Sequence, residues 1–113
     1  SVKIRGTHRL PRFLMCRSDV ALQLGRPHDA YDDAARAISI LRNGDDPEAA
    51  SANVGRAYST FGRALQAQGK QVEAAAAFQS AAEHLRNALG PDHPETRRAR
   101  EQAAGRAPTR PPP

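Results

Sequence analysis

Hydrophobic side chains recur at helical spacing along four stretches of the chain, and a glycine or proline separates each stretch from the next. This spacing predicts amphipathic helices over 7–24, 27–41, 47–68 and 70–89. A fifth, shorter helix that is polar on most faces is predicted over 94–105. Alanine is abundant, and aromatic residues make up only 4% of the sequence. Because alanine favours helices and is depleted in sheets, we expect an all-α protein.

Residues typical of helix ends mark two of the predicted starts. Thr7 is expected to be the N-cap of the first helix, and Pro11 to lie in its opening turn, where a missing amide hydrogen is tolerated. Asp46 is expected to cap the third helix, with Pro47 at the first helical position. Both starts therefore carry a side-chain cap and a proline in the predictions.

Two helical hairpins follow from the short connections at Gly25 and Gly69. Each connection has room only for a tight turn, so the helices on either side of it must be antiparallel. The two glycines are 44 residues apart, and aligning them brings similar residues together in both hairpins. The aligned pairs include Ala30 with Ala74, Ala34 with Phe78, and Ala37 with Ala81. Such an internal repeat predicts a stacked helical array.

The second hairpin reads Tyr58-x-x-Phe61-Gly62-x-x-Leu65 on its first helix and Ala74-x-x-x-Phe78-x-x-Ala81 on its second. This spacing resembles the tetratricopeptide repeat (TPR). The sequence LGPDHPET that follows resembles the longer TPR variant found in kinesin light chains and in many bacterial signalling proteins. In the first hairpin, Arg17 and Ser18 stand where the family has a large apolar residue and a glycine.

The resemblance covers residues 7–105 and implies a short, right-handed, TPR-like solenoid of stacked antiparallel helix hairpins. Repeat one would span about 7–42 and repeat two about 47–89, with a C-terminal capping helix over about 94–105. Small residues at the helix contacts would let the helices lie close together. The proline-bracketed Asp-His turn would then start the capping helix.

Charge is concentrated at the ends of the chain, whose formal net charge is +5. The N-terminal segment 1–6 is basic, and the tail 106–113 is proline-rich and expected to be disordered or extended. A nucleic-acid interface needs basic residues clustered on a folded surface, so nucleic-acid binding through these ends is the least favoured function. No apolar run reaches the roughly 20 residues of a membrane span, so we expect no membrane partner.

Two features of composition bear on the source and compartment. The single Cys16 cannot form an internal disulfide, which favours a reducing cytoplasm. Arginine greatly outnumbers lysine, which is typical of a GC-rich bacterial genome. We therefore expect a cytoplasmic, bacterial protein.

No catalytic or metal-binding motif stands out. The four histidines are scattered, and none has the spacing that holds zinc. Asp92 and His93 have the residue types of an orienting group and a general base. In the repeat variant that the chain resembles, however, this turn is structural. We therefore expect no enzymatic activity and no cofactor.

In TPR arrays the first helix of each pair lines a concave groove that receives a peptide or a partner helix. Carrying this over by register places eight residues in the groove: Arg12, Met15, Asp19, Gln23, Arg56, Ser59, Arg63 and Gln66. Arg56 and Arg63 are seven residues apart and so share one helical face. Because arginine suits carboxylates, an acidic segment or a C-terminal carboxylate is the expected ligand. The alternative is that these arginines form only a solvated face.

These features predict a non-catalytic protein–protein interaction module within a larger regulatory or signalling protein. The alternative is a homo-oligomerisation module of a regulator or kinase. Two repeats and a cap are fewer than the roughly three repeats that usually bury a continuous core. We therefore expect either further repeats in a larger protein or self-association through an exposed end. The sequence leaves open the partner's identity and the choice between a sensor and a scaffold.

Overall fold

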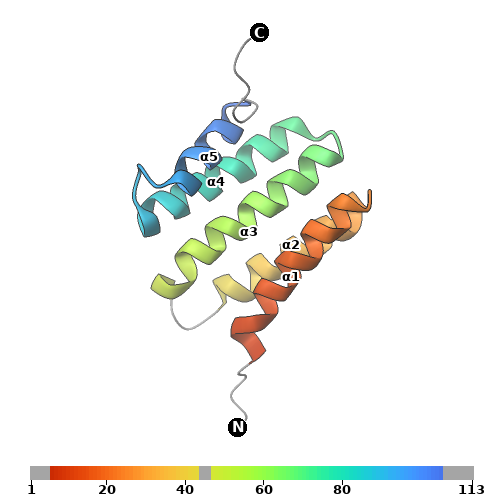
Figure 1. The fold of residues 1–113 in the computed structure, drawn as a ribbon, viewed down its shortest axis with the longest axis horizontal. Helices are drawn as coiled ribbons and strands as arrows, with labels where there is room; N and C mark the ends of the chain where they lie inside the picture. The colour runs from red at the N-terminus through yellow and green to blue at the C-terminus, as the bar shows by residue number, and fades with distance from the viewer. Residues whose placement is uncertain (1–5, 44–46, 106–113) are drawn as a thin grey trace.

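The structure is a computed structural model and describes residues 6–43 and 47–105. Within these residues it contains five α-helices and no strand, which confirms the prediction of an all-α protein. The helices are α1 (Gly6–Gln23), α2 (Pro27–Arg42), α3 (Pro47–Ala67), α4 (Gln71–Leu89) and α5 (Pro94–Ala103) (Figure 1). Each predicted boundary lies within two residues of the observed one, the usual margin for helix ends.

Two predictions about the start of the first helix are wrong. Thr7 lies inside α1 rather than at its N-cap, because the helix already includes Gly6. Pro11 therefore falls in the second turn instead of the opening turn, and its side chain is fully buried. The predicted cap Asp46 and the tail 106–113 lie outside the described residues, as does most of the basic segment at the N-terminus.

Both hairpins turn at a glycine with positive φ, 76° at Gly25 and 82° at Gly69. In each turn the glycine N–H donates to the carbonyl three residues earlier, and the next N–H donates to the carbonyl five residues earlier. This pair of bonds is the Schellman motif, which satisfies carbonyls at a helix C-terminus. No atom lies within 4 Å of a Cβ built at either glycine, so the backbone conformation, not lack of space, requires glycine here.

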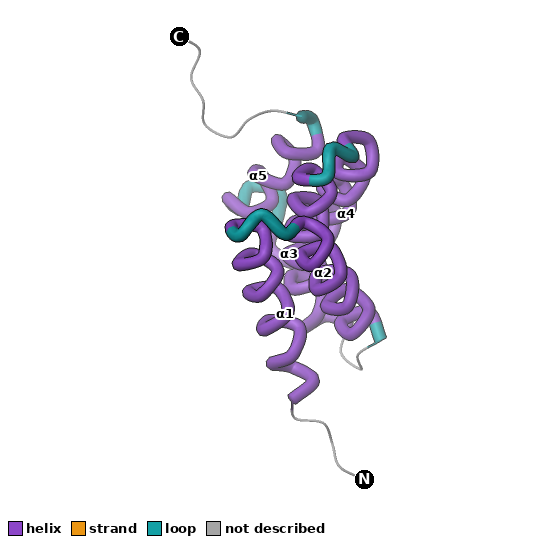
Figure 2. Tube along the Cα trace, turned by 90° about the vertical axis from the view of Figure 1, so that its right-hand side faces the viewer, coloured by secondary structure: helices purple, strands orange, loops and turns teal. Residues whose placement is uncertain are grey.

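The helices pack in chain order, each against the next, and α1 also contacts α3. Figure 1 shows this sequence of helices running from α1 and α2 at one end of the molecule to α5 at the other. Seen from the side, α1, α3 and α5 lie along one side, and α2 and α4 along the other (Figure 2). Side chains of the odd-numbered helices therefore share one face of the molecule.

Residues aligned across the 44-residue period are buried in both hairpins. Ala30, Ala34 and Ala37 on α2 have no exposed surface. The aligned residues on α4 are also buried: Ala74, Phe78 and Ala81 are at most 2% exposed. The internal repeat seen in the sequence thus corresponds to two hairpins that bury the same positions.

At one of these aligned positions the two hairpins differ in which helix carries the larger residue. A Cβ built on Gly62 would lie 2.8 Å from Cε1 of Phe78, so the large ring requires a glycine opposite it. In the first hairpin the equivalent positions hold Ser18 and Ala34, both fully buried. Ser18 Oγ donates a hydrogen bond of 2.8 Å to the carbonyl oxygen of Ala30. A small residue on α2 thus makes room for the serine on α1.

The apolar residues of α1 are divided between the core and solvent. Leu14 and Ala21 are buried. Three other large apolar residues of α1, Leu10, Phe13 and Val20, are exposed, and so is Leu24, which directly follows the helix. On α4, Val72 is also exposed, although it belongs to the apolar spacing that predicts this helix. Periodicity therefore identified the helices but not which apolar positions are covered.

The turn before α5 is held by side-chain bonds. His93 is the N-cap, and its Nδ1 accepts a hydrogen bond of 3.1 Å from the backbone N–H of Glu95. Thr96 is fully buried, and its Oγ1 donates to the carbonyl oxygen of Gly90 at 2.8 Å. Thr96 and Ala99 face the core, and the arginines of α5 are exposed. None of the described helices is both long and apolar enough to cross a membrane.

Candidate functional site

A groove of about 440 Å³ lies on the face shared by α1, α3 and α5. Side chains from these three helices, with Leu85 of α4 at the base, form its walls. The lining residues are Arg12, Met15, Cys16, Asp19, Arg56, Ser59, Thr60, Arg63, Leu85, Glu95, Arg98 and Gln102. Three helices that are far apart in sequence thus contribute polar side chains to one concave surface.

Six of the eight residues predicted to line a groove lie in this one: Arg12, Met15, Asp19, Arg56, Ser59 and Arg63. They form three pairs related by the 44-residue repeat, which explains how α1 and α3 present them to the same space. Gln23 and Gln66 are exposed and do not line the groove. Both lie in the last turn of their helices, beyond the end of the groove.

The third wall of the groove comes from α5, which the prediction did not include. Glu95, Arg98 and Gln102 all line the groove. Their spacing of three and then four residues puts them on one face of a helix, and this spacing was visible in the sequence. The orientation of α5 relative to α3, which depends on the turn before Pro94, could not be predicted from the sequence.

Arg56 is held by an acidic residue of α5. Its Nε and Nη2 donate to Oε1 and Oε2 of Glu95 at 2.9 and 3.2 Å, a bidentate ion pair between α3 and α5. Its Nη1 donates to Oδ1 of Asn53 at 3.0 Å. The hydrogen bonds from Arg56 lower the pKa of the Glu95 carboxyl, while partial burial opposes this shift. The guanidinium group of Arg56 is therefore oriented to bind a carboxylate, and in this structure it binds the carboxylate of Glu95.

Arg63 is placed between α1 and its own helix. Its Nη2 lies 2.8 Å from Oδ1 of Asp19 and donates to Oγ1 of Thr60 at 3.1 Å. The contact with Asp19 is an ion pair by distance but not an aligned hydrogen bond. Oδ1 of Asp19 is itself buried and accepts no hydrogen bond from the described residues. The carboxylate is thus attracted to Arg63 without being fully satisfied by it.

The groove carries an excess of positive charge. It is lined by four arginines and two acidic residues. Arg56 and Arg63 are paired with the two carboxylates, whereas neither Arg12 nor Arg98 forms an ion pair within the described residues. Both are exposed at the surface of the groove. An anionic group that enters the groove would therefore meet two guanidinium groups that are not held in an ion pair.

Two histidines, His84 and His93, make contacts within the fold. Nδ1 of His93 accepts the N-cap hydrogen bond of α5, and His84 stacks on Tyr58 with ring centroids 5.7 Å apart. Cys16 is exposed at the groove. No three or more His, Cys, Asp or Glu residues in the described part of the chain are grouped so that they could hold a metal ion.

Comparisons of the chain with models of protein families, with curated proteins and with solved structures returned no match. What the groove can bind is therefore inferred from the side chains that line it. These are guanidinium, hydroxyl and amide groups around a small apolar base formed by Leu85 and Met15. Such a surface can bind carboxylates and backbone amides.

Proposed function

We propose that the chain is a non-catalytic protein-interaction module of the TPR type, and that the groove between α1, α3 and α5 binds an acidic peptide segment. The assignment to the TPR type is supported by two hairpins with the same turn 44 residues apart. It is also supported by the contact of Gly62 with Phe78 at the position where the family motif has glycine and an aromatic residue.

The observation that carries the proposed ligand is the way the groove handles the protein's own carboxylates. Glu95 lies on Arg56 in a bidentate pair, and Asp19 lies 2.8 Å from Arg63. Arginine recognises carboxylates through this planar, forked geometry. Because two arginines are already paired, Arg12 and Arg98 are the groups that would bind the first carboxylates of a ligand.

A peptide of several acidic residues suits this arrangement better than a single carboxylate. Exposed ion pairs contribute only about 0.2–1 kcal/mol each, so affinity must come from several contacts along the groove. An extended chain also places side chains at regular intervals, and its backbone amides can bond to Ser59 and Gln102. The groove would thus act as a preformed surface that recognises the peptide without any chemical reaction.

The test is fluorescence anisotropy with dye-labelled hexaglutamate, and with hexaglutamine as the uncharged probe. We expect hexaglutamate to bind and hexaglutamine not to bind. The double variant Arg12→Ala/Arg98→Ala should weaken binding about 2- to 30-fold, the range expected from two exposed ion pairs. Raising the salt concentration should weaken binding by the wild-type protein, because exposed charges are screened.

A matched control is the double variant Arg36→Ala/Arg86→Ala. It removes the same charge from exposed positions on α2 and α4, outside the groove. We expect it to bind hexaglutamate as the wild type does, apart from a small effect of net charge. Equal weakening by both double variants would show that only the overall charge attracts the peptide, and it would exclude the groove as the site.

A further inference from the structure

An uncovered apolar stripe runs along the outer side of α1. Within the described residues five large hydrophobic side chains are exposed; three of them belong to α1 and a fourth, Leu24, directly follows its last residue. These four are Leu10, Phe13, Val20 and Leu24, with 38, 55, 50 and 64% of their surface exposed. With Arg17 they follow the helical spacing i, i+3, i+7, i+10, i+14, which places all five within about 80° of the helix circumference. We refer to these five residues as the α1 stripe.

The internal repeat indicates what kind of surface this is. A shift of 44 residues takes the four apolar residues of the stripe to Val54, Ala57 and Ala64 on α3 and to Gln68 just after it. Three of these positions, those of Ala57, Ala64 and Gln68, are covered by α2. Ala57 packs in one cluster with Ala37, Ala64 packs with Ala30, and Nε2 of Gln68 donates to the carbonyl oxygen of Pro27 at 3.3 Å. The α1 stripe therefore has the register of a helix-covered surface, with Phe13 and Val20 where α3 has the smaller Ala57 and Ala64.

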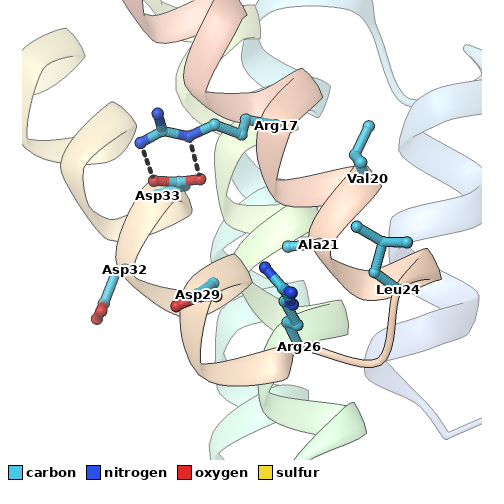
Figure 3. Close-up of a pocket in the computed structure, with 8 residues that line it drawn as sticks. All are labelled: Arg17, Val20, Ala21, Leu24, Arg26, Asp29, Asp32 and Asp33. Carbon is cyan, nitrogen blue, oxygen red and sulfur yellow. Dashed lines mark hydrogen bonds and ion pairs between the residues drawn. The ribbon is translucent and has the colours of Figure 1, made fainter.

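The charge in the middle of the stripe is neutralised within the chain. Nε and Nη2 of Arg17 donate to the two carboxylate oxygens of Asp33 on α2, both at 2.8 Å, and Figure 3 shows the guanidinium lying parallel to the carboxylate. The guanidinium carbon also lies 5.4 Å from the ring centroid of Phe13. A helix that packs on the stripe would therefore not have to bury a free charge.

The order of residues along the stripe makes it complementary to itself. When two copies of α1 pack antiparallel about Arg17, Leu10 of one copy lies opposite Leu24 of the other, and Phe13 lies near Val20. Next to Leu24 there is a cavity of about 330 Å³, lined by Val20 and Ala21 on its apolar side. The cavity lies at the end of the stripe where Leu10 of the second copy would pack.

Charge also favours this orientation. The other side of the cavity is lined by Asp29, Asp32 and Arg26, which are exposed and form no ion pair within the described residues (Figure 3). Two unpaired carboxylates thus stand against one unpaired guanidinium, which leaves a net negative charge. The nine residues that precede Leu10 in the sequence include Lys3, Arg5 and Arg9 and no acidic residue. Antiparallel packing brings the N-terminal end of α1 in one copy, which follows Lys3 and Arg5 and includes Arg9, toward the start of α2 in the other. Parallel packing would bring like ends together.

We propose that the α1 stripe binds the α1 stripe of a second copy of the chain, in an antiparallel dimer with two-fold symmetry. Head-to-tail association is disfavoured because α5, at the other end of the molecule, presents arginine and glutamate side chains rather than an apolar face. The stripe is about 21 Å long, which corresponds to an interface at the small end of specific ones. The dimer therefore forms at micromolar rather than nanomolar concentration.

The first test is sedimentation velocity from low micromolar to several hundred micromolar protein. The wild type should shift from monomer to dimer over this range. Val20→Glu should raise the dimer dissociation constant at least about tenfold, because dimerisation would bury an unpaired carboxylate. The matched control is Val72→Glu, which adds the same charge at an exposed valine of α4 off the stripe and should dimerise as the wild type does. Both changes are at exposed positions, and circular dichroism checks that each variant is folded.

The second test uses Cys16, the only cysteine of the chain, as a position marker. In the antiparallel pair the two Cys16 residues lie on the same side, next to the two-fold axis, about one interhelical distance of 8–10 Å apart. A bismaleimide with an arm of about that length should therefore give a covalent dimer of the wild type. Val20→Glu should reduce its yield, and Val72→Glu should not.

Three results would overturn the proposal. One is a wild-type protein that stays monomeric over the whole concentration range. Another is a dimer that Val20→Glu leaves intact or that Val72→Glu weakens equally. The third is a dimer in which Cys16 does not cross-link. None of these results affects the proposed binding of acidic peptide, since Val20 does not line the groove.

Discussion

The contact between Gly62 and Phe78 allows a prediction with a defined sign and size. A Cβ at position 62 would lie 2.8, 2.9 and 3.0 Å from three ring carbons of Phe78. The ring is 1% exposed and cannot move into solvent. Such overpacking typically costs about 1–3 kcal/mol, while alanine gains about 1 kcal/mol over glycine in helix propensity. Gly62→Ala should therefore lower the free energy of unfolding by up to about 2 kcal/mol.

The same reasoning makes a sharper prediction when the ring is reduced. Phe78→Leu alone should destabilise the protein, because it leaves part of the buried space empty. In the Phe78→Leu background the added methyl group has room, so Gly62→Ala should become neutral or stabilising by up to about 1 kcal/mol. The two changes should thus show a favourable coupling energy of about 1–2 kcal/mol. The first hairpin already carries this combination of a larger residue on α1 and a smaller one on α2, in Ser18 and Ala34.

Urea denaturation of the wild type, both single variants and the double variant measures this coupling, with helix content followed by circular dichroism. Additive effects of the two changes would refute the proposed contact. So would stabilisation by Gly62→Ala in the wild-type background, because it would mean that propensity alone decides the outcome. A matched reference for propensity is the difference in stability between Gln79→Gly and Gln79→Ala at an exposed position of α4.

Three further predictions concern single interactions. The bonds from Arg17 lower the pKa of Asp33 in the folded state, so the pair stabilises the fold above the unfolded pKa of about 4, and this stability is lost as the pH falls through the lower folded value. Asp33→Asn should therefore flatten the fall of unfolding free energy below about pH 4, measured by urea denaturation at several pH values. Thr96→Val should cost about 0.5–1.5 kcal/mol in the same assay at neutral pH, because the carbonyl of Gly90 loses one hydrogen bond and keeps the one from the His93 N–H. Gly69→Ala should cost about 1–2 kcal/mol and lower the melting temperature, because its φ of 82° strains any residue with a Cβ.

The helices could be predicted because the signals that define them are local. Gly25 and Gly69 end their helices because of their backbone conformation, and Pro27, Pro47 and Pro94 are the first residues of theirs. Each of these boundaries therefore depends on one or two residues. The 44-residue repeat then related the two hairpins without any information on tertiary contacts. Thr7 and Pro11 were misplaced because a cap can be recognised only when the first helical residue is known.

The groove was predicted in part, for a related reason. The register of the repeat placed Arg12 and Arg56 together, because equivalent positions of stacked hairpins face the same side. The repeat gave no register for α5, which follows a longer turn and lies outside the two aligned hairpins. Glu95 was therefore missed as the partner of Arg56, although the two form the best-aligned ion pair of the groove. Sequence periodicity identifies which residues share a face of one helix. The groove also depends on how α5 packs beside α1 and α3, which periodicity does not predict.

The geometry of α1 keeps the two proposed interactions apart. Successive residues of a helix are about 100° apart, so a helix of 18 residues can present three separate faces. On α1 the core takes Leu14, Ser18 and Ala21. The groove is lined by Arg12, Met15 and Asp19. The stripe contains Leu10, Phe13, Arg17 and Val20 of this helix.

Each of these sets repeats every three or four residues, and no residue is shared between them. A dimer through the stripe would therefore leave the groove accessible in both copies. Val20→Glu should consequently weaken dimerisation and leave binding of hexaglutamate unchanged, whereas Arg12→Ala/Arg98→Ala should weaken binding of hexaglutamate and leave dimerisation unchanged. Loss of both properties in either variant would mean that α1 is remodelled as a whole, and that its faces do not act independently.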